Sequence, residues 1–268
     1  MKLNDLLLMT PRLRRPEDYE AMYDDFIESS GGSRVIDRFT IPSGKQNADY
    51  WLEFGDAEML VELKQVSKYD ASLTVDSYFT ELIRRGKVKN IERTFTGPVQ
   101  ISPDSLSPMA WRKFYEKFRP AIENALKKAA GQLRDTAEFV SGTRRKICGV
   151  ILSNTGDYGL STDLLFRLAE HKLKSEWKNG RFKKIEFLIC HTVDLFTEEV
   201  HPLHSRRIVK SMEDEALVSG VLHLQEMWLS YVGVAMGFET KLASSTSVEH
   251  ARLNLQQQFA GKIQLSQK

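Results

Sequence analysis

Three charged side chains lie within two neighbouring apolar segments, where a buried strand would normally carry none. Asp49 belongs to segment 48–54, and Glu62 and Lys64 belong to segment 58–66. Side chains alternate between the two faces of a strand, so Glu62 and Lys64 project to the same face. Burying unpaired charges is costly, so their presence here indicates a use. Two acids with a lysine suit metal-assisted phosphodiester cleavage.

The turn between the two segments predicts how these charges meet. Residues 55–56 are Gly-Asp, and a Gly-X pair is a signal for a two-residue hairpin loop. Phe54 then pairs with Ala57, and the same register places Asp49 opposite Glu62. Directly opposed Cβ atoms lie roughly 4.5–5.5 Å apart, and oxygen ligands at that separation suit Mg²⁺ or Mn²⁺. A three-residue loop would shift the register by one and remove this geometry.

The Glu-x-Lys triplet alone is a weak indicator, because it occurs four times in the chain. The copy at Glu62 is distinguished by its apolar strand and by the acid opposite. A structural ion pair between Glu62 and Lys64 is the alternative. The other three copies have polar or helical surroundings, where we expect solvated charges: Glu170/Lys172, Glu176/Lys178 and Glu239/Lys241.

This arrangement resembles the PD-(D/E)xK nuclease superfamily, whose members share the restriction-endonuclease-like fold. Its motif is an acid at the start of one core strand and Glu-x-Lys on the next. Asp49, Glu62 and Lys64 match that motif, and Ala48 stands in place of the motif proline. The resemblance implies that Asp49, Glu62 and the Leu63 backbone carbonyl hold Mg²⁺ or Mn²⁺. It also implies that Lys64 positions the attacking water and offsets charge on the phosphate.

Two helices contribute further candidates through the same resemblance, which covers roughly residues 16–190. Gln132 matches a glutamine that many members carry on the second core helix, so it is a candidate catalytic residue. A boundary glutamine with a local hydrogen bond is the alternative. Some members have an additional acid on the first helix, and Glu20 and Glu28 both fit that description.

The order of predicted elements indicates an α/β fold. Strands that alternate with helices after an antiparallel hairpin predict a restriction-endonuclease-like core, with a mixed central sheet flanked by helices. Beside the hairpin, apolar patterns predict helices over 16–28, 120–139 and 162–177, and strands over 34–41, 146–153 and 184–192.

The predicted domain organisation is a nuclease-like core over 1–210 and a C-terminal helical extension and tail over 211–268, with a helix within 213–236. Residues 67–118 interrupt the core pattern as an insertion or subdomain after the third strand. The insertion carries bases that either contact phosphate or form an ordinary solvated helix end: Arg84, Arg85, Lys87, Lys89 and Arg93.

Composition bounds the remaining functions. The net charge of +2 is too small to indicate nucleic-acid binding, although local clusters of basic residues could still provide it. No segment approaches the roughly 20 apolar residues of a membrane span, so no membrane association is expected. Cys148 and Cys190 fall in predicted strands as buried thiols, typical of a reducing, cytoplasmic protein. His201 and His204, with His191 before them, lack the cysteines of a structural zinc site.

The function that follows is a Mg²⁺-dependent endonuclease acting on nucleic acid, with DNA as the superfamily's default substrate. Restriction or defence against foreign DNA is the context that the resemblance suggests. Nucleases of this type that cut both strands often work as dimers, so a homodimer or a partner subunit fits the resemblance. The rival function is a non-catalytic nucleic-acid-binding or assembly subunit with the same fold.

Overall fold

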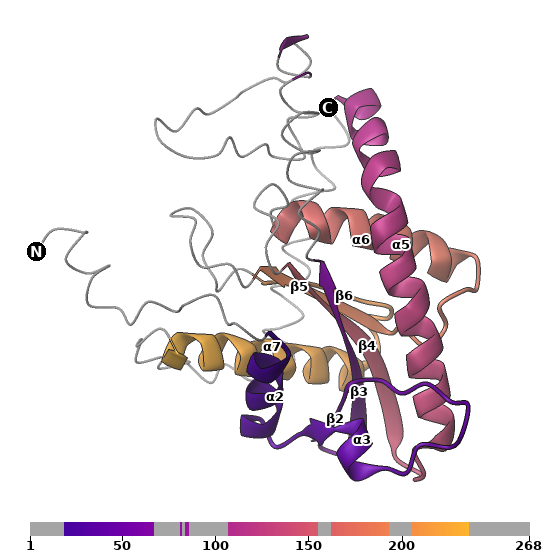
Figure 1. The fold of residues 1–268 in the computed structure, drawn as a ribbon, viewed down its shortest axis with the longest axis vertical. Helices are drawn as coiled ribbons and strands as arrows, with labels where there is room; N and C mark the ends of the chain where they lie inside the picture. Colours follow the sequence, from indigo (N-terminus) through magenta and orange to yellow (C-terminus); the bar gives the residue numbers. More distant parts are fainter. Residues whose placement is uncertain are drawn as a thin grey trace, which may run out of the picture.

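The computed structural model describes residues 19–66, 81, 84–85, 107–154, 162–192 and 205–235. Its centre is a six-stranded open sheet with the strands in sequence order (Figure 1). β1, β2 and β3 form an antiparallel meander, β3, β4 and β5 run parallel, and β6 returns antiparallel to β5. The predicted α/β class with a mixed sheet is confirmed. The strands are β1 (Ser33–Arg34), β2 (Tyr50–Phe54), β3 (Ala57–Val66), β4 (Arg145–Asn154), β5 (Phe187–Thr192) and β6 (Ser205–Val209).

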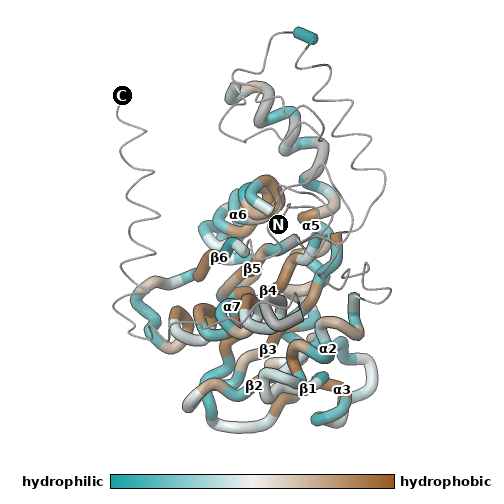
Figure 2. The backbone as a smooth tube through the Cα atoms, turned by 90° about the vertical axis from the view of Figure 1, so that its left-hand side faces the viewer, coloured by the Kyte–Doolittle hydropathy of each residue, from teal (hydrophilic) through white to brown (hydrophobic). Residues whose placement is uncertain are grey.

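Helices cover both faces of this sheet. α5 and α6 pack on one face and α2 and α7 on the other (Figure 1), and each pair closes its own hydrophobic cluster. Figure 2 shows hydrophobic stretches along β4 and β5 in the interior, as expected for parallel strands buried on both sides. The helices are α2 (Tyr19–Ser29), α3 (Val35–Arg38), α5 (Pro108–Phe139), α6 (Thr162–Lys178) and α7 (Glu215–Ala235).

The hairpin register predicted from the sequence is confirmed. Phe54 pairs with Ala57, and Tyr50 pairs with Val61. Gly55 opens the turn with a φ of 55°, a backbone conformation that glycine adopts without steric cost. The apolar pattern and the turn agree on one register, because a slip by one residue would move every core side chain to the other face.

The first strand is much shorter than predicted, and the expectation for 34–41 is wrong. Only Ser33 and Arg34 pair with β2, and the chain then turns into the short helix α3. The backbone N–H of Val35 donates to the Asp49 carbonyl, and β2 begins just after that residue. The apolar run therefore meets no partner strand beyond this point, and Ile36 is left 59% exposed.

Helix α5 begins at Pro108, twelve residues before the predicted start, so the end of the predicted insertion is helical. Proline suits the first turn of a helix. Pro120 lies within the same helix, where proline removes one backbone hydrogen bond. Ion pairs with i,i+4 spacing support the helix on both sides of it: Arg112–Glu116 and Arg119–Glu123.

The C-terminal side of the described chain supplies part of the core. β6 was not predicted, because two arginines interrupt its apolar pattern. Helix α7, expected within 213–236, buries Leu217, Val221, Leu224 and Trp228 against the sheet in the cluster that also contains α2. None of the described helices is long and apolar enough to cross a bilayer. Cys148 and Cys190 are buried free thiols, as expected.

Candidate functional site

A polar cleft of about 480 Å³ opens where the start of β2 meets the second half of β3. The meander supplies most of its wall, and α2, α3 and the loop before β2 supply the remainder. Three of the predicted site residues, Asp49, Leu63 and Lys64, line this cleft together. Its lining residues are Glu20, Arg34, Ile36, Asn47, Asp49, Tyr50, Leu63, Lys64 and Gln65.

Asp49 is fixed against the end of β3. It immediately precedes β2, and its Oδ2 atom accepts a hydrogen bond of 2.8 Å from the backbone N–H of Leu63. The carboxylate thus lies beside the Glu62–Leu63 peptide, as the extended hairpin register predicts. Burial raises the pKa of Asp49, and the Leu63 amide and Lys64 oppose that rise.

Glu62 is the most buried acid of the site, with no exposed surface. The Lys64 ammonium donates a hydrogen bond to its Oε1 atom. Its Oε2 atom is buried and makes no hydrogen bond of standard geometry, although the Asp49 backbone N–H lies close enough to lower the pKa of Glu62. Burial first, and the neighbouring charge of Asp49 second, raise the pKa of Glu62 to about 8, although Lys64 acts in the opposite direction. A bound cation would satisfy the Oε2 atom and relieve the repulsion between the two acids.

Of the two candidate acids on the first helix, the cleft includes Glu20. Glu28 is exposed and is not part of the lining. The negative charge of Glu20 also adds to the rise in the pKa of Asp49, so these two acids lie near each other. Glu20 is therefore the additional acid that the fold brings to the site.

Arg34 is a cleft residue that sequence reasoning missed. Its guanidinium binds Asp24 through two hydrogen bonds, and the Tyr50 hydroxyl donates to the same carboxylate. The sequence pattern makes Arg34 the first residue of the strand predicted over 34–41 and gives it no functional signal. The chain ends that strand at once, so the side chain lies at the cleft instead.

Gln132 does not line the cleft. Its side-chain amide donates to the Asn47 carbonyl at 3.0 Å, two residues before Asp49. Further along the same face of α5, Thr136 Oγ1 accepts from the Ala48 N–H at 2.6 Å, and Asp135 Oδ2 accepts from the Gln46 N–H at 3.3 Å. Helix α5 therefore holds the backbone of the loop that delivers Asp49. We call Gln132, Asp135 and Thr136 the loop clamp.

The sequence offered a partial signal for the loop clamp. Asp135 and Thr136 follow Gln132 at i+3 and i+4, so all three share one helix face. Their partners are backbone groups, which no residue pattern identifies.

Two of the basic candidates, Arg84 and Arg85, do not line the cleft. Arg84 and Arg85 are exposed and pair with Glu81 at i,i+3 and i,i+4 spacing, as on an ordinary solvated helix. Lys87, Lys89 and Arg93 lie outside the described residues.

Two expectations about histidines and Glu-x-Lys copies are settled for the residues that the structure describes. His191 is buried against Tyr23 and Trp228, and its Nε2 atom shares a hydrogen bond with the Tyr23 hydroxyl, so it belongs to the core. The expectation of solvation is wrong for Lys172 and Glu176, which are buried and paired across one turn of α6. Lys178 is exposed, and Glu170 is partly exposed and pairs with Lys174. His201, His204, Glu239 and Lys241 lie outside the described residues.

Asp49 lines the cleft, whereas Glu62 is fully buried next to Asp49 and is not part of the lining. Within the described ranges, no group of three or more His, Cys, Asp or Glu side chains could hold a metal. Magnesium nevertheless binds through one or two carboxylates, with waters and substrate phosphates completing its shell. Asp49 and Glu62, with the buried Oε2 atom, fit such a partial ligand set.

Comparisons of this chain with protein-family models, with curated proteins and with solved structures find no match.

Proposed function

We propose that this protein is a metal-dependent endonuclease that hydrolyses phosphodiester bonds in DNA. The observation that carries the proposal is the fully buried Glu62 carboxylate beside Asp49, with an Oε2 atom that makes no hydrogen bond of standard geometry. A buried acceptor without a well-formed hydrogen bond costs about 1–3 kcal/mol, and here a second acid adjoins it. Among simple occupants, a divalent cation answers both problems.

The order of elements supports a restriction-endonuclease-like core as part of this proposal. A helix precedes the antiparallel meander, and a second helix leads to a strand parallel to the third. This is the order that the motif resemblance implies. The acids lie where the second and third strands adjoin, which is where that motif places them.

The chain's own residues divide the chemistry between them. Asp49, Glu62 and the Leu63 carbonyl would hold Mg²⁺ or Mn²⁺, which when bound lowers the pKa of a water and offsets charge on the phosphate. Lys64 is held by Glu62 and borders the cleft, with its side chain 20% exposed. From there it positions the attacking water and stabilises negative charge on the scissile phosphate.

The test uses the full chain, purified and incubated with plasmid, linear duplex, single-stranded DNA and RNA, with Mn²⁺ or with EDTA. We expect cleavage of DNA only with the metal. Asp49→Asn, Glu62→Gln and Lys64→Met should each lower kcat by about 10²-fold or more. Calorimetric Mn²⁺ titration should show binding that Asp49→Asn and Glu62→Gln remove.

The matched control is Glu53→Gln, which neutralises an exposed acid of the same hairpin outside the cleft. It should cleave like the wild type. A wild-type protein that binds DNA but neither cleaves it nor binds Mn²⁺ would instead be the non-catalytic subunit. Equal cleavage by all four variants would remove Asp49, Glu62 and Lys64 from the mechanism.

A further inference from the structure

Strand β6 forms one end of the sheet, far along it from the meander and its cleft. It pairs with β5 through residues 205–209 on one side. In an antiparallel pair, about half of the backbone N–H and C=O groups point away from the partner strand. Among the residues that the structure describes, no strand pairs with the outer edge of β6, so this edge presents polar backbone groups in the geometry that a further strand would use.

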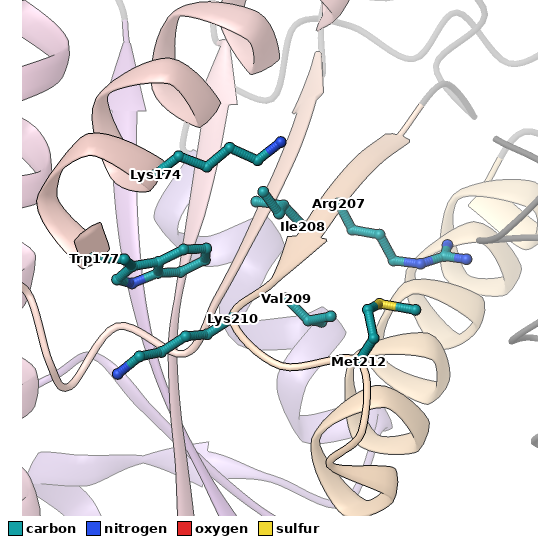
Figure 3. A pocket seen from close by; sticks show the side chains of 7 residues that line it. All are labelled: Lys174, Trp177, Arg207, Ile208, Val209, Lys210 and Met212. Carbon is teal, nitrogen blue, oxygen red and sulfur yellow. The ribbon is translucent and has the colours of Figure 1, made fainter. Parts of the chain in front are cut away.

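A groove of about 210 Å³ runs beside this edge. Trp177 and Lys174 of α6 border it on one side, and Met212 follows β6 on the other (Figure 3). Ile208 and Val209 of β6 contribute apolar surface between them. The groove therefore combines apolar surface with a strand edge, and this is the surface that strand addition requires.

The groove is positively charged. Of the seven residues that line it, Lys174, Arg207 and Lys210 are cationic and none is acidic. Lys174 pairs with Glu170 on its own helix. Lys210 donates to the Lys183 carbonyl, and Arg207 is largely buried, with Glu226 of α7 near enough to offset part of its charge.

We infer that the β6 edge binds an extended acidic segment of a partner protein by strand addition, with its acidic side chains on the α6 side, against Lys174 and Lys210. Backbone hydrogen bonds to β6 would hold the segment, and the alternate, apolar side chains would contact Val209 and Met212 on the other face. This interaction surface is separate from the nuclease proposal, because no residue of the Asp49 cleft takes part.

Two other occupants fit less well. A second copy of the chain, paired β6 to β6, would oppose the same cations across the new ladder, and like charges directly opposite are destabilising. Nucleic acid would satisfy the charge, but it leaves the strand's backbone groups and the apolar lining without matching partners. The acidic peptide satisfies the charge, the backbone and the apolar surface together.

The probe is a fluorescein-labelled peptide of alternating glutamate and valine, titrated with the full chain and followed by fluorescence anisotropy. Its first control is the same peptide N-methylated at two adjacent central residues, which removes one backbone donor from each edge and keeps the charge. We expect the N-methylated peptide to bind at least tenfold more weakly. Hydrogen exchange should show added protection of the β6 amides in the peptide complex.

The variant is Lys174→Glu combined with Lys210→Glu, and its matched control is Lys178→Glu, an exposed lysine of α6 outside the groove. The double variant should lose at least tenfold in peptide affinity, and the control should bind like the wild type. Thermal unfolding shows whether both variants keep the wild-type fold.

Three results would each overturn the inference. These are no peptide binding at millimolar concentration, equal binding of the N-methylated peptide, or displacement of the peptide by an oligonucleotide of equal charge at lower concentration. Nuclease activity is not a readout here, so failure of either proposal leaves the other standing.

Discussion

At the scale of single residues, Glu62 carries the central conflict of the site. A carboxylate with no exposed surface has one cation, Lys64, and one neighbouring acid, Asp49. With a pKa raised to about 8, much of the Glu62 population is protonated at neutral pH when no metal is present. Strongly shifted pKa values of this kind are common at functional sites, although buried ion pairs also produce them.

His191 provides a prediction at the same scale that does not depend on the nuclease proposal. Burial lowers its pKa from 6.5 to about 3, because the ring lies against Tyr23 and Trp228. His191 is therefore protonated below about pH 6.5 in the unfolded chain, whereas it stays neutral in the folded chain. The contribution of neutral His191 to the free energy of unfolding is fully present above that pH. It falls as the pH drops toward 3, by roughly 2 kcal/mol between pH 7 and pH 5.

Urea unfolding of wild type and His191→Gln at pH 7 and pH 5 measures this difference. The variant should be less stable at pH 7, because it loses ring packing, but its stability should fall about 2 kcal/mol less on acidification. His223→Gln, which changes an exposed histidine of α7, should keep the wild-type slope. An unchanged slope in His191→Gln would show that this group does not govern acid sensitivity.

At the scale of elements, the loop clamp is how α5 serves the site. Gln132, Asp135 and Thr136 hold three consecutive backbone groups, those of residues 46–48, immediately before Asp49. Asp49 itself then reaches the Leu63 amide. The helix positions the acid through the backbone and contributes no side chain to the cleft lining.

Thr136→Val tests this positioning role. The substitution keeps the shape of the side chain but leaves the buried Ala48 N–H without an acceptor, which should cost about 1–3 kcal/mol of stability. If Asp49 moves with the loop, kcat for DNA should fall while KM changes little, and Mn²⁺ should bind more weakly. Steady-state kinetics and calorimetry measure these effects.

Two companion variants separate positioning from stability. Thr136→Ser restores the acceptor and should recover kcat. Lys128→Ala, an exposed change on the same helix, should leave both kcat and stability as in the wild type. A Thr136→Val protein with wild-type kcat and Mn²⁺ affinity would show that the clamp supports the fold alone.

An element could be predicted from the sequence where the residues that determine it are close together in the chain. The hairpin was predictable because its apolar pattern and its Gly-Asp turn are local and agree. The strand predicted over 34–41 was too long because the end of β1 at Arg34 depends on where β2 begins, sixteen residues later. β6 was missed because its apolar alternation is broken by Arg206 and Arg207. The loop clamp and the cleft position of Arg34 rest on tertiary contacts that no local pattern records.

At the scale of the whole molecule, the sheet is stable only if both faces are covered. α5 and α6 close the face that carries Glu62, and α2 and α7 close the other. Trp228 of α7 is 1% exposed and contacts Tyr23 and Phe26 of α2, so the two helices form one layer over the sheet. The predicted division of the chain after residue 210 would cut through that layer.

A chain that ends at Lys210 should therefore fail to fold, because it exposes the apolar face that α7 covers. Within the full chain, Trp228→Ala should cost about 3–5 kcal/mol, and Trp228→Phe should cost less because a ring still packs on Tyr23. Urea unfolding and near-ultraviolet circular dichroism measure both effects. Because α2 also carries Glu20, a loosened layer should weaken Mn²⁺ binding at the cleft as well. Cooperative unfolding of the 1–210 chain with a native-like spectrum would show instead that α7 is dispensable to the core.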